Sequence, residues 1–72
     1  AQIAATEATH SAAEAELRNA QSQFDRIATL ASRQIATPQD EEDAQGRLDA
    51  ARQQELATAA AIEAARANLD II

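Results

Sequence analysis

The sequence contains no cysteine, methionine, tryptophan, tyrosine, valine or lysine, and it has one phenylalanine, one glycine and one proline. Without cysteine, a disulfide framework and a thiolate metal site are excluded. With so few large apolar residues, a chain of 72 residues has too little surface to bury in an ordinary globular core. No apolar run approaches the roughly 20 residues of a membrane span, so we expect no direct membrane insertion by this segment.

Positive charge is also scarce. Six arginines stand against twelve acidic residues, which gives a formal net charge of −6. Nucleic-acid-binding proteins neutralise phosphates with clusters of lysine and arginine. We therefore expect no nucleic-acid partner.

Alanine dominates what remains, on a background of glutamate, glutamine, arginine and leucine. Alanine has the highest intrinsic helix propensity, and this set of residues is typical of long helices and coiled coils. The composition therefore predicts an all-α protein.

Two heptad patterns predict a first helix over about 3–33 and a second over about 38–70. The seam of the first helix is predicted to comprise Ile3, Thr6, His10, Ala13, Leu17, Ala20, Phe24, Ile27 and Ala31. The seam of the second is predicted to comprise Ala44, Leu48, Ala51, Glu55, Thr58, Ile62, Ala65, Leu69 and Ile72. Glu55 interrupts the apolar pattern. Leu56, beside it, can rotate inward to replace it. For Glu55 itself, we favour a salt bridge to an arginine of the first helix over a buried acid.

The segment Thr37-Pro38-Gln39-Asp40 carries the signals of a helix start. Thr37 is a good N-cap, Asp40 can complete a capping box, and proline is tolerated at the first helical position. A link of only about 34–37 favours adjacent antiparallel helices, so we predict a two-helix antiparallel coiled-coil hairpin. The alternative, one continuous or domain-swapped helix, would place Pro38 in a helix interior at a cost of about 3 kcal/mol. We treat residues 1–72 as a single hairpin and expect it to be a piece of a longer protein.

Residues suited to catalysis or metal binding are few. His10 is the single histidine, and pairing with a neighbouring carboxylate such as Glu7 or Glu14 is favoured over a weak metal site. The acidic run 40–43 suits the positive end of a helix dipole better than a calcium loop, whose ligands alternate around a glycine turn. No serine has a base arranged beside it, so we expect no enzyme, no cofactor and no metal.

The remaining candidate is a surface for recognition at the reversal. Arg26 and Leu30 are four residues apart and so share one face of the first helix, while Thr37 opens the second helix. Leu30 lies outside the predicted seam. Its pattern fits equally a contact point for a partner and a side chain that folds over the hairpin end to close it.

These residues carry a resemblance. Segments 24–30 and 35–44 resemble the hairpin tip of periplasmic adaptor proteins, also called membrane fusion proteins, of tripartite efflux pumps and type I secretion systems. The tip of that family reads as an arginine, a leucine four places later, and a serine or threonine seven places after that. Arg26, Leu30 and Thr37 reproduce both spacings. This sequence departs from the family in having no glycine in the turn.

The resemblance implies a function and a set of partners. The tip would engage the periplasmic end of a TolC-type outer-membrane channel through Arg26, Leu30 and Thr37. Neighbouring adaptor protomers would stand side by side as a six-membered funnel. An inner-membrane transporter would be reached through domains outside this sequence. The expected location is the periplasm, with the full-length protein attached to the inner membrane.

Two other functions stay open from the sequence. One is a coiled-coil interaction arm of an unrelated cytoplasmic enzyme or chaperone. The other is a free alanine-rich helical stress protein, against which the absence of lysine and the cap at Thr37 both count.

Overall fold

The computed structural model describes the backbone of residues 2–70 and the side chains of residues 3–68. Within that part, the chain forms two α-helices and no strand: α1 spans Gln2–Ser32 and α2 spans Pro38–Asp70. Compared with the expected ranges of about 3–33 and 38–70, α1 begins and ends one residue earlier, so the link covers residues 33–37.

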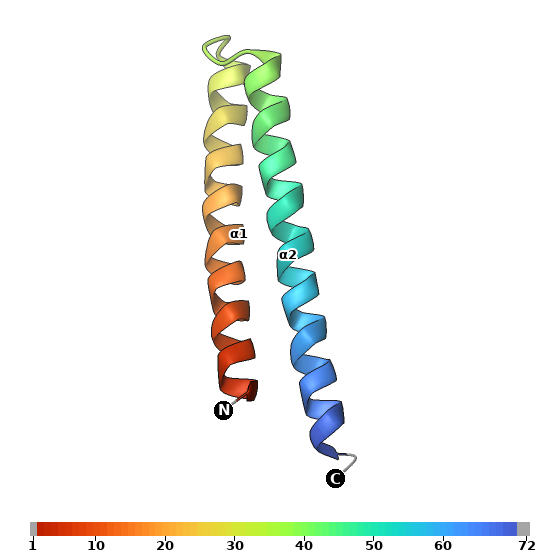
Figure 1. Ribbon diagram of the computed structural model, residues 1–72. Helices are drawn as coiled ribbons and strands as arrows, with labels where there is room; N and C mark the ends of the chain where they lie inside the picture. The colour runs from red at the N-terminus through yellow and green to blue at the C-terminus, as the bar shows by residue number, and fades with distance from the viewer. Residues whose placement is uncertain (1, 71–72) are drawn as a thin grey trace.

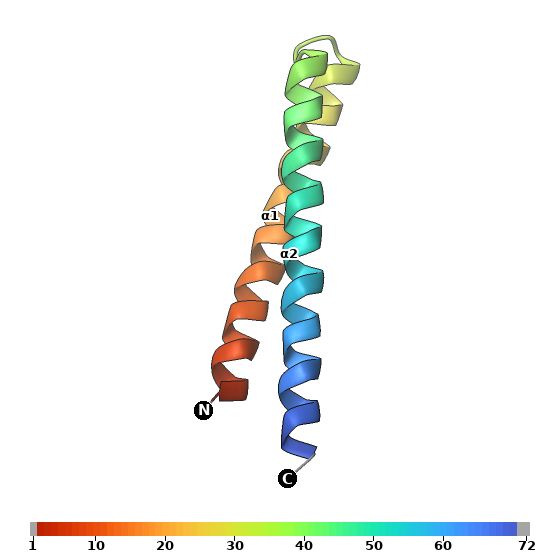
Figure 2. The ribbon, with the colours of Figure 1, turned by 45° about the vertical axis from the view of Figure 1, so that its right-hand side comes forward.

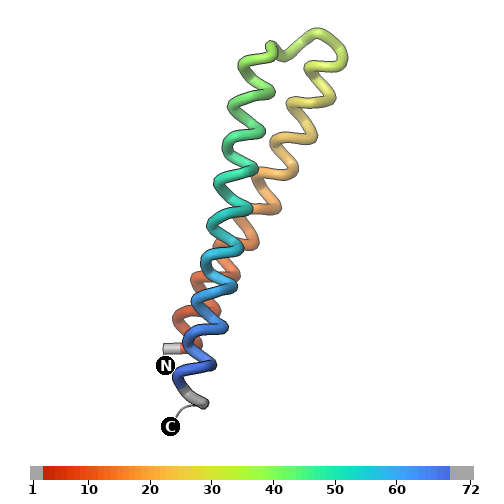
Figure 3. The backbone as a smooth tube through the Cα atoms, turned by 90° about the vertical axis from the view of Figure 1, so that its right-hand side faces the viewer, coloured from red at the N-terminus to blue at the C-terminus, as the bar shows by residue number. Residues whose placement is uncertain are grey.

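The two helices run antiparallel and side by side, and the chain reverses direction at one end of the pair (Figure 1). The first turns of α1 and the last turns of α2 lie together at the opposite end (Figure 1). In the turned views α1 passes from one side of α2 to the other along its length (Figure 2, Figure 3). The prediction of an all-α antiparallel hairpin is confirmed.

The molecule is a rod of 58 × 14 × 11 Å with a radius of gyration of 16.5 Å. A compact globule of this length would have a radius of gyration of about 11 Å. The elongated shape follows from the sequence, because two long helices with one thin apolar seam can bury it only against each other. In the part of the chain from Gln2 to Asp70, neither helix is apolar enough over a sufficient length to cross a membrane.

The seam forms as the heptad pattern predicts. Every predicted seam position with a described side chain is buried or half-buried, while Leu69 and Ile72 have side chains outside the described residues. The core is centred on Leu48, which is 2% exposed, and comprises Ala20, Leu48 and Ala51 with Leu17 and Phe24 packed against them. Alanine buries little area, so these few large side chains supply most of the burial.

A polar layer interrupts the seam farther from the reversal, and we define it as His10, Glu14, Glu55 and Thr58. The Thr58 hydroxyl donates to the Glu55 carbonyl oxygen at 2.9 Å, so it accepts from His10 Nδ1 at 2.8 Å. His10 Nε2 lies 3.6 Å from a Glu14 carboxylate oxygen and 3.8 Å from a Glu55 carboxylate oxygen. The predicted pairing of His10 with a nearby carboxylate is therefore confirmed for Glu14.

Both expectations for Glu55 are wrong. Leu56 does not rotate into the seam; its side chain is 59% exposed. Nor does Glu55 pair with an arginine of α1, because His10 stands opposite it. Arg52, the nearest arginine along α2, contacts Asp49 and Gln21 instead. Glu55 keeps its seam position with its side chain 26% exposed to water and the His10 ring facing it across the seam.

Candidate functional site

The end of α1 is closed by a Schellman motif, a hydrogen-bonded turn that satisfies the last carbonyl groups of a helix. Gln34 adopts a left-handed conformation with φ of 62°, the one non-glycine residue in the described chain with positive φ. The Gln34 N–H donates to the Ala31 carbonyl oxygen at 2.9 Å, and the Ile35 N–H donates to the Leu30 carbonyl oxygen at 2.9 Å. The Leu30 oxygen also accepts from Ala36 at 3.3 Å. The backbone of the reversal is therefore ordered by main-chain bonds.

The start of α2 carries the predicted capping box. The Asp40 N–H donates to the Thr37 hydroxyl oxygen at 3.1 Å, and the Thr37 N–H donates back to an Asp40 carboxylate oxygen at 3.1 Å. The Thr37 carbonyl oxygen accepts from the Glu41 N–H at 3.2 Å and so begins the helix. Thr37 is exposed, and its hydroxyl hydrogen remains available for an outside acceptor. Thr37 thus has a structural role and a surface accessible to a partner.

The acidic run is engaged in the same helix start. One Asp40 oxygen serves the capping box, and an Asp43 oxygen accepts from Gln39 Nε2 at 2.9 Å. Among the described residues, no group of three or more His, Cys, Asp or Glu side chains is placed to hold a metal ion. Four negative charges in the first turns of α2 complement its positive dipole end.

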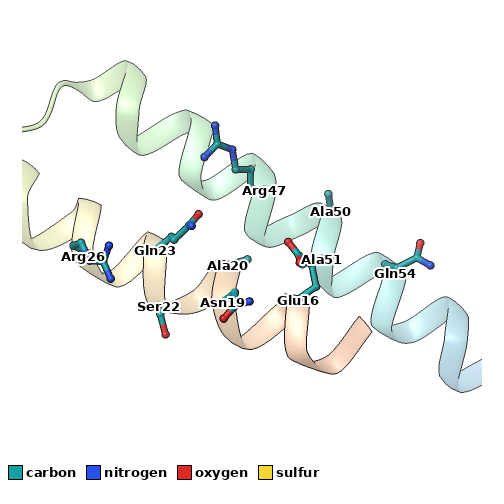
Figure 4. A pocket seen from close by; sticks show the side chains of 10 residues that line it. All are labelled: Glu16, Asn19, Ala20, Ser22, Gln23, Arg26, Arg47, Ala50, Ala51 and Gln54. Carbon is teal, nitrogen blue, oxygen red and sulfur yellow. The ribbon is translucent and has the colours of Figure 1, made fainter. Parts of the chain in front are cut away.

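Arg26 lies on the flank of the hairpin below the reversal and is exposed. It faces a shallow side groove between the two helices (Figure 4). Residues of α1 and α2 both line this groove, and they are Glu16, Asn19, Ala20, Ser22, Gln23, Arg26, Arg47, Ala50, Ala51 and Gln54. Nearer the reversal, the hollow continues past Ile27, Asp40 and Asp43.

Arg47 is a neighbour of Arg26 that the sequence analysis did not single out. It lines the same hollows from α2, and within the described chain neither arginine has an ion-pair partner. The available signal was its place directly before the seam residue Leu48, which puts it at the rim of the interface. The two guanidinium groups lie among the acidic residues Glu16, Asp40 and Asp43, which line the same hollows, so this flank carries charges of both signs.

Leu30 and Ile35 are large apolar residues at the reversal, and they differ in exposure. Leu30 is half-buried at the end of α1, whereas Ile35 is 68% exposed. Of the three predicted tip residues, Arg26 and Thr37 are thus exposed and Leu30 is partly covered, and all three lie in the third of the rod that ends at the reversal. Ile35 was not predicted as a site residue.

Comparison of the chain with protein-family models, with curated proteins and with solved structures finds no match.

Proposed function

We propose that this chain is a non-catalytic docking rod, the hairpin of a periplasmic adaptor that meets a TolC-type outer-membrane channel with its tip. One observation carries the proposal: the reversal at residues 33–37 gathers Arg26, Leu30 and Thr37 at one end of a 58 Å rod. The residues that match the family's pattern therefore lie at an end of the rod that a partner can reach.

The shape of the rod supports separate roles for its paired helices and its tip. A stiff pair of helices transmits position, and a few side chains at its end carry recognition. Arg26 supplies a cation without an internal partner, and Thr37 supplies a hydroxyl donor on a backbone fixed by its capping box. Because the main chain at both positions is already ordered, binding requires additional ordering only of the side chains.

The flanks of the rod fit the second part of the proposal, lateral contact with neighbouring adaptor protomers in a six-membered funnel. Both flanks carry exposed polar side chains, and one carries the side groove with Arg26 and Arg47. In this proposal the inner-membrane transporter is reached through domains outside this sequence, and the location is the periplasm.

A binding measurement tests the proposal. A TolC-type channel in detergent is immobilised, and the chain is compared with Arg26→Asp and Leu30→Ser. Arg66→Asp is the matched control, because it makes the same charge change at an exposed position near the other end of the rod. We expect Arg26→Asp to weaken binding at least tenfold, or about 1.4 kcal/mol, and Arg66→Asp to leave it within about twofold.

Equal loss in both arginine variants would mean that charge alone governs binding and that the tip has no special role. No binding by the native chain would reject the adaptor assignment. Combined with cooperative thermal melting, that result would favour a coiled-coil arm of an unrelated protein.

A further inference from the structure

Two large apolar side chains are strongly exposed in the described part of the chain: Ile35 at 68% and Leu56 at 59%. They occupy very different places. Leu56 lies on the outer face of α2, in the middle of a regular helix. Ile35 belongs to the five-residue reversal, the segment that forms one end of the rod (Figure 1).

The main chain around Ile35 is fixed by hydrogen bonds on both sides. Its own N–H donates to the Leu30 carbonyl oxygen at 2.9 Å, and the next N–H, of Ala36, donates to the same oxygen. Thr37 is then fixed by its reciprocal bonds with Asp40. The main chain that presents Ile35 therefore needs little further ordering when a partner covers the side chain.

The packing that would normally explain an apolar residue here is incomplete. In a Schellman motif, the residue after the left-handed one usually packs back against the residue at the position of Leu30. Ile35 keeps two thirds of its surface in water despite having that partner nearby. The preceding residue, Gln34, meanwhile holds a left-handed conformation that glycine adopts at no steric cost. An unfavourable backbone conformation thus presents an apolar side chain to solvent.

We propose that Ile35 is the apolar anchor of the tip, that it enters an apolar recess at the periplasmic end of the channel, and that Leu30 instead closes the end of the hairpin. This inference rests on the proposed function and replaces Leu30 with Ile35 as the apolar contact residue of the tip. The exposed side chain of Arg33, two residues before Ile35, has no ion-pair partner within the described residues, so acidic groups at the rim of the recess would complement it.

The chain offers its own matched control. Ile35→Ser and Leu56→Ser each remove one exposed large apolar side chain, so both should leave the thermal midpoint of the hairpin nearly unchanged. Binding to the immobilised channel should separate them. We expect Ile35→Ser to raise Kd at least tenfold and Leu56→Ser to change it less than twofold, while Ile35→Leu, which keeps an apolar side chain, retains most of the affinity.

The outcomes distinguish this inference from the proposed function. If Arg26→Asp loses binding but Ile35→Ser does not, the inference is overturned and the adaptor assignment stands. Equal losses in Ile35→Ser and Leu56→Ser overturn it as well, because binding would then follow general surface hydrophobicity. If the native chain does not bind the channel, the proposed function and this inference both fail.

Discussion

The seam nearest the reversal and the polar layer farther along the rod use the same heptad spacing for different purposes. Toward the reversal, Leu48 is enclosed by Ala20, Ala51, Leu17 and Phe24. At the polar layer, the corresponding positions hold a histidine that contacts a threonine and two carboxylates. The apolar part is the main source of stability, because free energy scales with the apolar area buried.

The polar layer contributes something else. Polar groups in a coiled-coil seam often fix the register of the helices, because any slip leaves them without partners. His10 and Thr58 lie on different helices and meet at 2.8 Å, so a shift by one turn would separate them. We infer that the apolar seam holds the helices together and that the polar layer determines which residues face each other.

The largest expected effect is at the centre of the apolar seam. Leu48→Ala removes the most buried large side chain and leaves a cavity between alanines too small to fill it. Such substitutions cost about 2–5 kcal/mol, and we expect a loss in that range by urea unfolding. Ile62→Ala, at a half-buried position beyond the polar layer, should cost clearly less. Equal losses would contradict the assignment of stability to the seam near the reversal.

A smaller effect is expected in the polar layer. Thr58→Val keeps the side-chain shape but removes the acceptor of the His10 hydrogen bond. We expect a loss of about 1 kcal/mol in the free energy of unfolding. Thr9→Val is the control, because Thr9 is exposed and bonds only to the carbonyl oxygen of Ala5 one turn earlier. A gain in stability from Thr58→Val would show that the layer costs more than it contributes.

The smallest expected effect has the opposite sign and lies in the reversal. Gln34→Gly relieves the strain of the left-handed conformation but adds conformational freedom to the unfolded chain. We therefore expect a net gain of about 0.5 kcal/mol in the free energy of unfolding. Gln53→Gly, at an exposed position inside α2, has no left-handed strain to relieve. We therefore expect only the cost of glycine in a helix, a loss of about 1 kcal/mol in the free energy of unfolding. A loss in both variants would mean that the Gln34 side chain stabilises the turn by other means.

Periodicity and local capping rules could predict most of the fold from the sequence. The seam follows from seven-residue spacing, and the start of α2 follows from Thr37, Pro38 and Asp40, because these signals act within one or two turns of helix. The end of α1 was harder to predict. In a sequence, a Schellman motif is usually recognised by a glycine at its left-handed position, and here Gln34 occupies that position instead.

Features that depend on contacts between the helices could not be predicted from the sequence. The sequence left open an inward rotation of Leu56 and favoured a pair between Glu55 and an arginine of α1, and neither occurs. His10 instead faces Glu55 across the interface, with its Nε2 3.8 Å from a Glu55 carboxylate oxygen. The spacing of residues along one helix does not determine which residue of the other helix lies opposite. The places of Arg47 and Ile35 were missed for the same reason, since one lies at a groove between two helices and the other follows the path of the reversal.

The reversal is the central claim, because the proposed tip exists only if the chain turns back. Cysteines introduced at the exposed positions Ala8 and Ala60 allow spin labels to report their separation by pulsed electron resonance, since the native chain has no cysteine. With the labelled chain diluted in excess unlabelled chain, the hairpin predicts a separation below about 30 Å, because packed helix axes lie about 8–10 Å apart. One continuous helix would place these residues about 78 Å apart at about 1.5 Å per residue, and that result would contradict the account.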